Sequence, residues 1–151
     1  ILIMFADLLN RLVQPEPDPL DDGDARLALT ALLVRVARSD GEYDASESQR
    51  ITRIVATRYG LSQTEAEALR GEAETLESEA PDTVRFTRAI KDAVPYDERV
   101  AVIESLWQVA MADGARNASE DALLRLVANF LGISDRDSAL ARQKVTATGS
   151  Q

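Results

Sequence analysis

The chain has 151 residues, of which 45% are hydrophobic, and 26 acidic against 17 basic side chains give a net charge of −9. This length and composition fit one folded domain with a sizeable core. The acidic balance argues against nucleic-acid binding, because a phosphate backbone repels it. Cysteine and histidine are both absent, which excludes disulfides, cysteine-type zinc sites and histidine as a general base.

The N-terminal part divides into two segments. Residues 1–14 carry an apolar stripe that predicts a short helix, which we expect to dock on its own domain more readily than on a membrane. Residues 15–24 form a linker rich in proline and aspartate, because prolines lack amide donors and hold the chain extended. The segment lacks a basic region and a cleavage site, so no signal peptide is expected.

From residue 24 onward, apolar residues recur at helical spacing. The predicted helices cover residues 24–38, 45–59, 62–79, 82–94, 97–111 and 118–131, with a last one from residue 134 and a frayed, disordered tail over 145–151. Gly60 and Gly132 are placed to end equivalent helices in the left-handed conformation. Nothing alternates with period two over a useful length, so we expect no strands.

Two features of these helices have structural interpretations. The helix over 62–79 begins with a capping-box pattern, Ser62 followed by Glu65. Its carboxylates are interpreted as mostly a solvated face: Glu65, Glu67, Glu72, Glu74, Glu77 and Glu79. Trp107 lies at core spacing in its helix, and we expect it in the core rather than in a ligand site.

A twelve-residue pattern occurs twice, 73 positions apart, at Val36–Glu47 and Val109–Glu120. Seven of the twelve positions are identical, and apolar residues at helical spacing precede both copies. This repeat predicts two copies of one helix–turn–helix unit with an acidic turn in each. The expected fold is therefore all-α, a single-domain helical bundle of about seven to eight helices with two pseudo-symmetric helix–turn–helix repeats, its main domain spanning residues 25–144.

Helix capping alone explains much of the repeated pattern. Gly41 and Gly114 suit a left-handed turn after a helix. The N-caps and their capping-box partners three residues later are Asp44 with Glu47 and Asn117 with Glu120. Each capping pair contributes on the order of 1 kcal/mol to stability, so these residues need no ligand to account for them.

Capping does not explain Asp40 and Asp113, which lie where the helix dipole disfavours negative charge. Nearby amides, an arginine or a bound cation would offset that cost. If a pseudo-twofold axis brings both turns together, their side chains would form an oxygen-rich site suited to Ca²⁺ or Mg²⁺. The predicted metal ligands are Asp40, Asp44, Glu47, Asp113, Asn117 and Glu120. Turn architecture without a metal remains the alternative.

The spacing does not make either turn an EF-hand. Aligning the first Asp-Gly with a calcium loop places Glu47 at the twelfth position, as required. The first and third ligand positions then fall on Val36 and Arg38, and in the second copy on Val109 and Met111. None of these can supply a carboxylate.

At these residues the chain resembles the tellurite-resistance TerB family, and within it a TerB-like branch, over about residues 25–144. The residues that carry the resemblance are Ser39-Asp40-Gly41 with Glu47, Ala112-Asp113-Gly114 with Glu120, Arg85-Phe86-Thr87, the stretch from Glu104 to Gly114, and Gly132 to Asp137. Two departures matter. Ser39 replaces the usual alanine, and Arg116 and Asn117 lower the negative charge of the second turn.

The resemblance implies an all-helical fold with two similar halves and an acidic face that binds divalent metal. It also implies a bacterial, cytoplasmic or membrane-peripheral protein of tellurite or general stress resistance. Its partners would be proteins, membrane-associated ones included, or a second copy in a homodimer. No nucleic acid is expected as a partner, and the sequence identifies no small-molecule substrate.

Our leading hypothesis is a non-catalytic binding or adaptor domain whose acidic face engages a cation or a basic partner. The alternative is a structural, oligomerisation or membrane-proximal module that uses the apolar N-terminal segment. A hydrolase with carboxylate-held Mg²⁺ is conceivable without histidine or cysteine. It is disfavoured because no glycine-rich phosphate loop or serine nucleophile motif accompanies the acids.

Overall fold

The computed structural model describes residues 7–10, 22–39, 43–80, 82–112 and 118–149. Over these ranges the chain forms helices and no strand, which confirms the predicted all-α fold. The helices are α2 (Asp22–Ser39), α3 (Ala45–Tyr59), α4 (Gln63–Glu79), α5 (Thr83–Ala93), α6 (Tyr96–Ala112), α7 (Ala118–Phe130) and α8 (Asp135–Gly149). Among the described helices, none is both long and apolar enough to cross a membrane.

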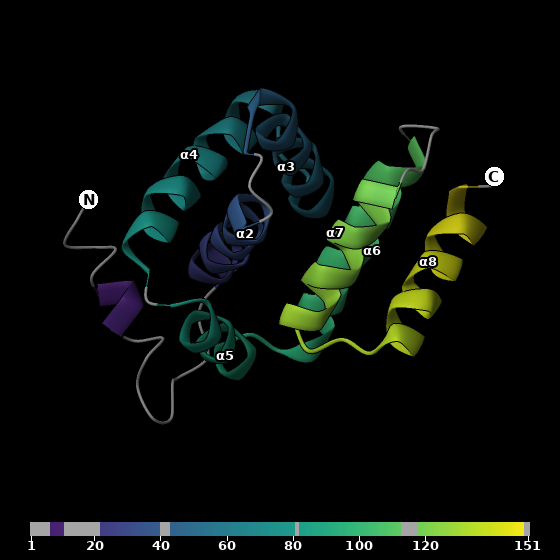
Figure 1. The fold of residues 1–151 in the computed structure, drawn as a ribbon. Helices are drawn as coiled ribbons and strands as arrows, with labels where there is room; N and C mark the ends of the chain where they lie inside the picture. The colour runs from purple at the N-terminus through teal and green to yellow at the C-terminus, as the bar shows by residue number, and fades with distance from the viewer. Residues whose placement is uncertain (1–6, 11–21, 40–42, 81, 113–117, 150–151) are drawn as a thin grey trace.

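The helices form two groups of three, α2–α3–α4 and α6–α7–α8, with α5 between them in the chain (Figure 1). In each group the first helix packs extensively on the third, α2 on α4 and α6 on α8. Across the groups, α3 packs on α6 and α2 packs on α7. A rotation that exchanges α2 with α6 and α3 with α7 turns the α3–α6 contact into the α7–α2 contact. The two groups are therefore related by a pseudo-twofold axis. The structural repeat therefore includes a third helix beyond the predicted helix–turn–helix unit.

Gly60 and Gly132 end the second helix of each repeat as predicted. Their φ angles are +65° and +70°, in the left-handed region where a side chain is strained. The amides of Leu61 and Ile133 each donate to a carbonyl five residues back, at 3.1 and 2.8 Å. This is the Schellman geometry, and it ends the second helix of both repeats in the same way.

The core is built from aliphatic side chains of all seven helices, with Phe86 as its largest fully buried member. Other fully buried side chains are Leu32, Val36, Ile54, Leu76, Ile90, Ile103 and Leu131. Burying each such side chain stabilises the fold by about 1.5–3 kcal/mol relative to exposure. Leu8 also lies in this core, with 4% of its surface exposed. The described part of the N-terminal segment thus docks on its own domain, as expected.

Two predicted boundaries were wrong. Helix α2 begins at Asp22, so the last residues of the 15–24 linker are helical. The acidic Asp24 in this first turn favours the positive end of the helix dipole. Helix α8 continues to Gly149, so most of the predicted 145–151 tail is helical. Val145 is buried among the core side chains and gives this last part of α8 a packing partner.

Candidate functional site

The first acidic turn leads into α3, where Asp44 is the N-cap. Its Oδ1 accepts the Glu47 amide at 3.0 Å, which confirms the predicted cap. The Glu47 carboxylate lies 3.6 Å from Arg50, so the predicted capping box is only half formed. The full box occurs at the start of α4. There Ser62 Oγ accepts the Glu65 amide at 3.2 Å, and Glu65 Oε1 accepts the Ser62 amide at 3.0 Å.

The other predicted metal ligands fall outside what the structure describes. Asp40, Asp113 and Asn117 lie in undescribed segments, and Glu120 belongs to α7 but its side chain is not described. Within the described ranges, no three acidic, histidine or cysteine side chains are grouped so that they could hold a metal ion. Binding of Ca²⁺ or Mg²⁺ at the turns therefore stays a prediction.

A buried carboxylate, Glu77 of α4, lies beside the end of α2. Arg35 Nε donates to Glu77 Oε1 at 2.7 Å, and Arg35 Nη2 donates to the Glu77 carbonyl at 2.9 Å. Arg38, in the last turn of α2, is paired with Glu77 Oε2. Glu77 is only 6% exposed, so its prediction as part of a solvated face was wrong. This network holds α2 against α4 through charge-assisted hydrogen bonds.

The sequence contained a signal for this network. Arg35 interrupts a run of buried residues in α2, and a charge inside such a run needs a buried partner. Glu77 directly follows the fully buried Leu76. Helical periodicity alone could not pair the two, because they are 42 positions apart.

The side chains around the first turn are held by further arginines. The Arg38 guanidinium lies 5.2 Å from the centre of the Tyr43 ring, directly before the Asp44 cap. Burial and the neighbouring Glu74 carboxylate raise the pKa of Tyr43 well above its ordinary value. Arg70 lies 3.8 Å from Glu74. The acids beside this turn are thus engaged by arginines, which leaves Asp44 as the described carboxylate most available to a cation.

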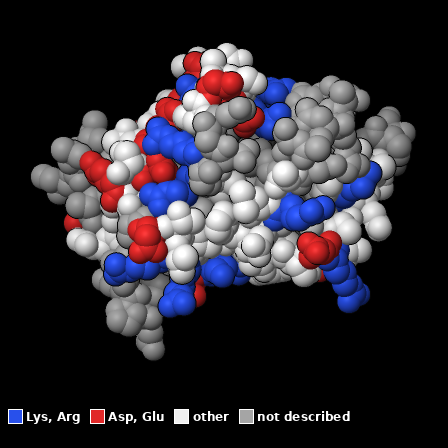
Figure 2. Space-filling model, viewed as in Figure 1, with Lys and Arg blue, Asp and Glu red and all other residues white. Residues whose placement is uncertain are grey.

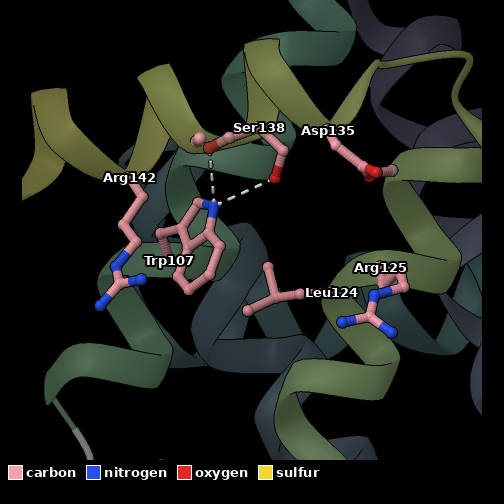
Figure 3. Close-up of a pocket in the computed structure, with 8 residues that line it drawn as sticks. Trp107, Leu124, Arg125, Asp135, Ser138 and Arg142 are labelled. Atoms are coloured by element: carbon pink, nitrogen blue, oxygen red, sulfur yellow. Dashed lines mark hydrogen bonds between the residues drawn. The ribbon is translucent and has the colours of Figure 1, made fainter.

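A cleft of about 430 Å³ lies between α7 and α8, with α6 beneath it (Figure 3). Trp107 of α6 and Leu124 of α7 form its floor, and Arg125 and Arg142 stand on either side. Trp107 is 8% exposed, so the predicted core position is confirmed, but the same side chain also lines this cleft. Sequence reasoning did not identify the cleft because it arises from the spacing of two helices.

Comparison with known proteins gives one match. A family model described as tellurite resistance protein TerB matches residues 26–143 of the chain. The match covers both repeats and all of α3 to α7. Neither the curated proteins nor the solved structures searched contain a match.

Proposed function

The chain belongs to the TerB family, and we propose that it is a non-catalytic binding domain. In this proposal its two Asp-Gly turns bind a divalent cation, Ca²⁺ or Mg²⁺, and present an acidic surface to a protein partner. The oxygen donors are the carboxylates and the amide oxygen of the repeated motif, since hard cations prefer oxygen ligands.

The observation that carries the proposal is the packing of the two repeats on each other. Helix α3 contacts α6 and α2 contacts α7. The C-terminal ends of α2 and α6, which lead into the two turns, both point to the upper side of Figure 1. The helix ends that lead into the two copies of the motif therefore lie on one side of the domain. This arrangement supports the proposal that both copies of the motif contribute to one site.

The geometry of Asp44 is compatible with a second role for its carboxylate. Asp44 is exposed, and its Oδ1 accepts the Glu47 amide. We assign Oδ2 to the cation. In the same proposal Asp40 and Asp113 become the principal ligands, because a cation would offset the unfavourable helix dipole at both positions.

Thermal unfolding of metal-stripped protein with and without millimolar Ca²⁺ or Mg²⁺ tests this function. A cation at about 100 times its dissociation constant adds about 2.7 kcal/mol, which raises the melting temperature by several degrees. The double variant Asp40→Asn/Asp113→Asn should abolish this rise.

The matched control is Asp82→Asn. Asp82 caps α5 by accepting the Arg85 amide at 3.0 Å, and asparagine is an equally good N-cap. This variant should keep the full metal-dependent rise. A rise that persists in the Asp40/Asp113 double variant, or no rise in the unaltered protein, would reject the cation site and favour the structural alternative.

A further inference from the structure

The two repeats differ most where their second and third helices meet. In the first repeat, α3 and α4 pack closely, whereas α7 and α8 make far fewer contacts. Arg70 of α4 joins the two helices of the first repeat. Its Nη1 donates to Thr52 Oγ1 at 2.9 Å and to the Ser48 carbonyl at 3.3 Å, both in α3. Thr52 is almost fully buried under this contact.

The equivalent positions in the second repeat carry two arginines. The repeat offset of 73 aligns Thr52 with Arg125, and the offset of 72 between Gly60 and Gly132 aligns Arg70 with Arg142. A guanidinium has no acceptor atom, so Arg142 cannot donate to Arg125 as Arg70 does to Thr52. The positive charges of Arg125 on α7 and Arg142 on α8 also repel each other. The interface between α7 and α8 therefore lacks the arginine–threonine hydrogen bond that joins α3 to α4.

Arg125 and Arg142 both line the cleft. Arg142 lies over the Trp107 ring, 5.3 Å from its centre, and both arginines are exposed. Within the described part of the chain, no carboxylate lies within ion-pair distance of either guanidinium. One carboxylate, Asp135 in the first turn of α8, also lines the cleft. The cleft lining is therefore net positive in a protein of net charge −9.

The floor of the cleft is apolar and its polar atoms are satisfied. Trp107 Nε1 donates to the Ser138 carbonyl at 3.1 Å and to Ser138 Oγ at 3.3 Å, which leaves the ring as an apolar surface. Leu124 and Ala128 complete the floor. Among the described residues over α7 and α8, Figure 2 shows several basic and few acidic side chains on this face.

We propose that this cleft binds a small organic acid. Its apolar body would lie on Trp107 and Leu124, its anionic group would be held by Arg125 at one side of this floor, and Arg142 would add positive charge from the other side (Figure 3). The volume of about 430 Å³ lies within the range of small-molecule sites, which combine an apolar lining with a few polar groups. Guanidinium groups are the side chains best suited to a carboxylate. The site is independent of the proposed cation at the Asp-Gly turns.

Trp107 provides the readout, because it is the only tryptophan in the chain. Titration of metal-free protein with decanoate or phenylbutyrate, below any micelle concentration, should give a saturable change in its fluorescence. Decanol and decyltrimethylammonium have comparable apolar bodies without the negative charge. Neither should bind with comparable affinity.

Variants separate the role of charge from that of shape. Arg125→Gln should weaken binding about tenfold, the loss of one charge-assisted hydrogen bond. Arg142→Gln should weaken it less, because it removes a more distant charge. Asp135→Asn should tighten binding, since it removes the negative charge from the lining. Arg136→Gln is the matched control, because Arg136 is an exposed arginine of α8 that does not line the cleft. Ala128→Leu fills the floor and should abolish binding.

Circular dichroism and melting temperature establish that each variant is folded. Calorimetry on the same variants confirms the dissociation constants without reliance on fluorescence. The proposal is overturned if neither acid binds saturably, if the cationic or neutral analogue binds as well, or if the Arg125 and Arg142 variants bind like Arg136→Gln.

Discussion

Glu77 of α4 accepts a hydrogen bond from Arg35 of α2 at 2.7 Å. Both groups are largely withdrawn from water, since 8% of the Glu77 side chain and 14% of the Arg35 side chain are exposed. Removing one partner leaves the other buried with an unpaired charge. We therefore expect Glu77→Leu to destabilise the domain by about 3 kcal/mol. Urea denaturation of the variant and the unaltered protein measures the difference.

The double variant Arg35→Met/Glu77→Leu separates pairing from packing. Replacing both partners with apolar side chains of similar size removes the unpaired charge, so most of the lost stability should return. Glu79→Gln on the same helix is the surface control, because Glu79 is exposed. A double variant no more stable than Glu77→Leu would show that the carboxylate contributes more than neutralisation of Arg35.

Asp44 distinguishes helix capping from cation binding. As an N-cap that accepts the Glu47 amide, it should lose about 1 kcal/mol on substitution by alanine in metal-free protein. Asp44→Asn should retain that stability, since asparagine also caps helices. If the asparagine variant also loses affinity for Ca²⁺ in calorimetry, the same carboxylate serves both roles. Equal destabilisation by alanine and asparagine would contradict the capping assignment.

The glycines that end α3 and α7 offer a matched pair. Both have positive φ, so alanine at either position is strained by about 1 kcal/mol. A Cβ on Gly60 would meet nothing within 4 Å, whereas one on Gly132 would lie 2.9 Å from Lys91 Cδ and 3.2 Å from Arg99 Nη1. Arg99 donates to the Leu131 carbonyl there. We expect Gly132→Ala to lower the melting temperature more than Gly60→Ala, and equal losses would contradict this assignment.

Tyr59 should make stability depend on pH in the alkaline range. Its hydroxyl is buried without a hydrogen-bond partner among the described residues, and burial raises its pKa from 10.0 to about 12. The folded state keeps this proton while the unfolded state releases it. The stability contribution is therefore full below pH 10 and is lost as pH rises toward 12.

The variant Tyr59→Phe should show a smaller loss of stability over this alkaline range, measured by urea denaturation at several pH values. At pH 7 it should leave stability unchanged or raise it by about 1 kcal/mol, because an unpaired buried hydroxyl is removed. Tyr96→Phe is the contrasting variant, since the Tyr96 hydroxyl is hydrogen-bonded to Asp137. A clear destabilisation by Tyr59→Phe at pH 7 would show that its hydroxyl has a partner.

Most helix boundaries were predictable because they depend on neighbouring residues. The bounds of α3 at Ala45–Tyr59 match the predicted helix, and its Asp44 cap and Gly60 end act within one turn. The start of α2 at Asp22 and the end of α8 at Gly149 were not predicted correctly. At α8, burial of Val145 depends on contacts that sequence periodicity does not define.

The sequence by itself determined the helical class, the duplication and the acidic turns, because periodicity, caps and repeated motifs are local properties of the chain. Only the tertiary structure decided that Glu77 is buried between two arginines and that the second repeat opens where the first is closed. Both depend on side chains distant in sequence. The hydrogen bond of Arg70 to Thr52, and the cleft lined by Arg125 and Arg142 at the equivalent positions, form only where two helices lie side by side.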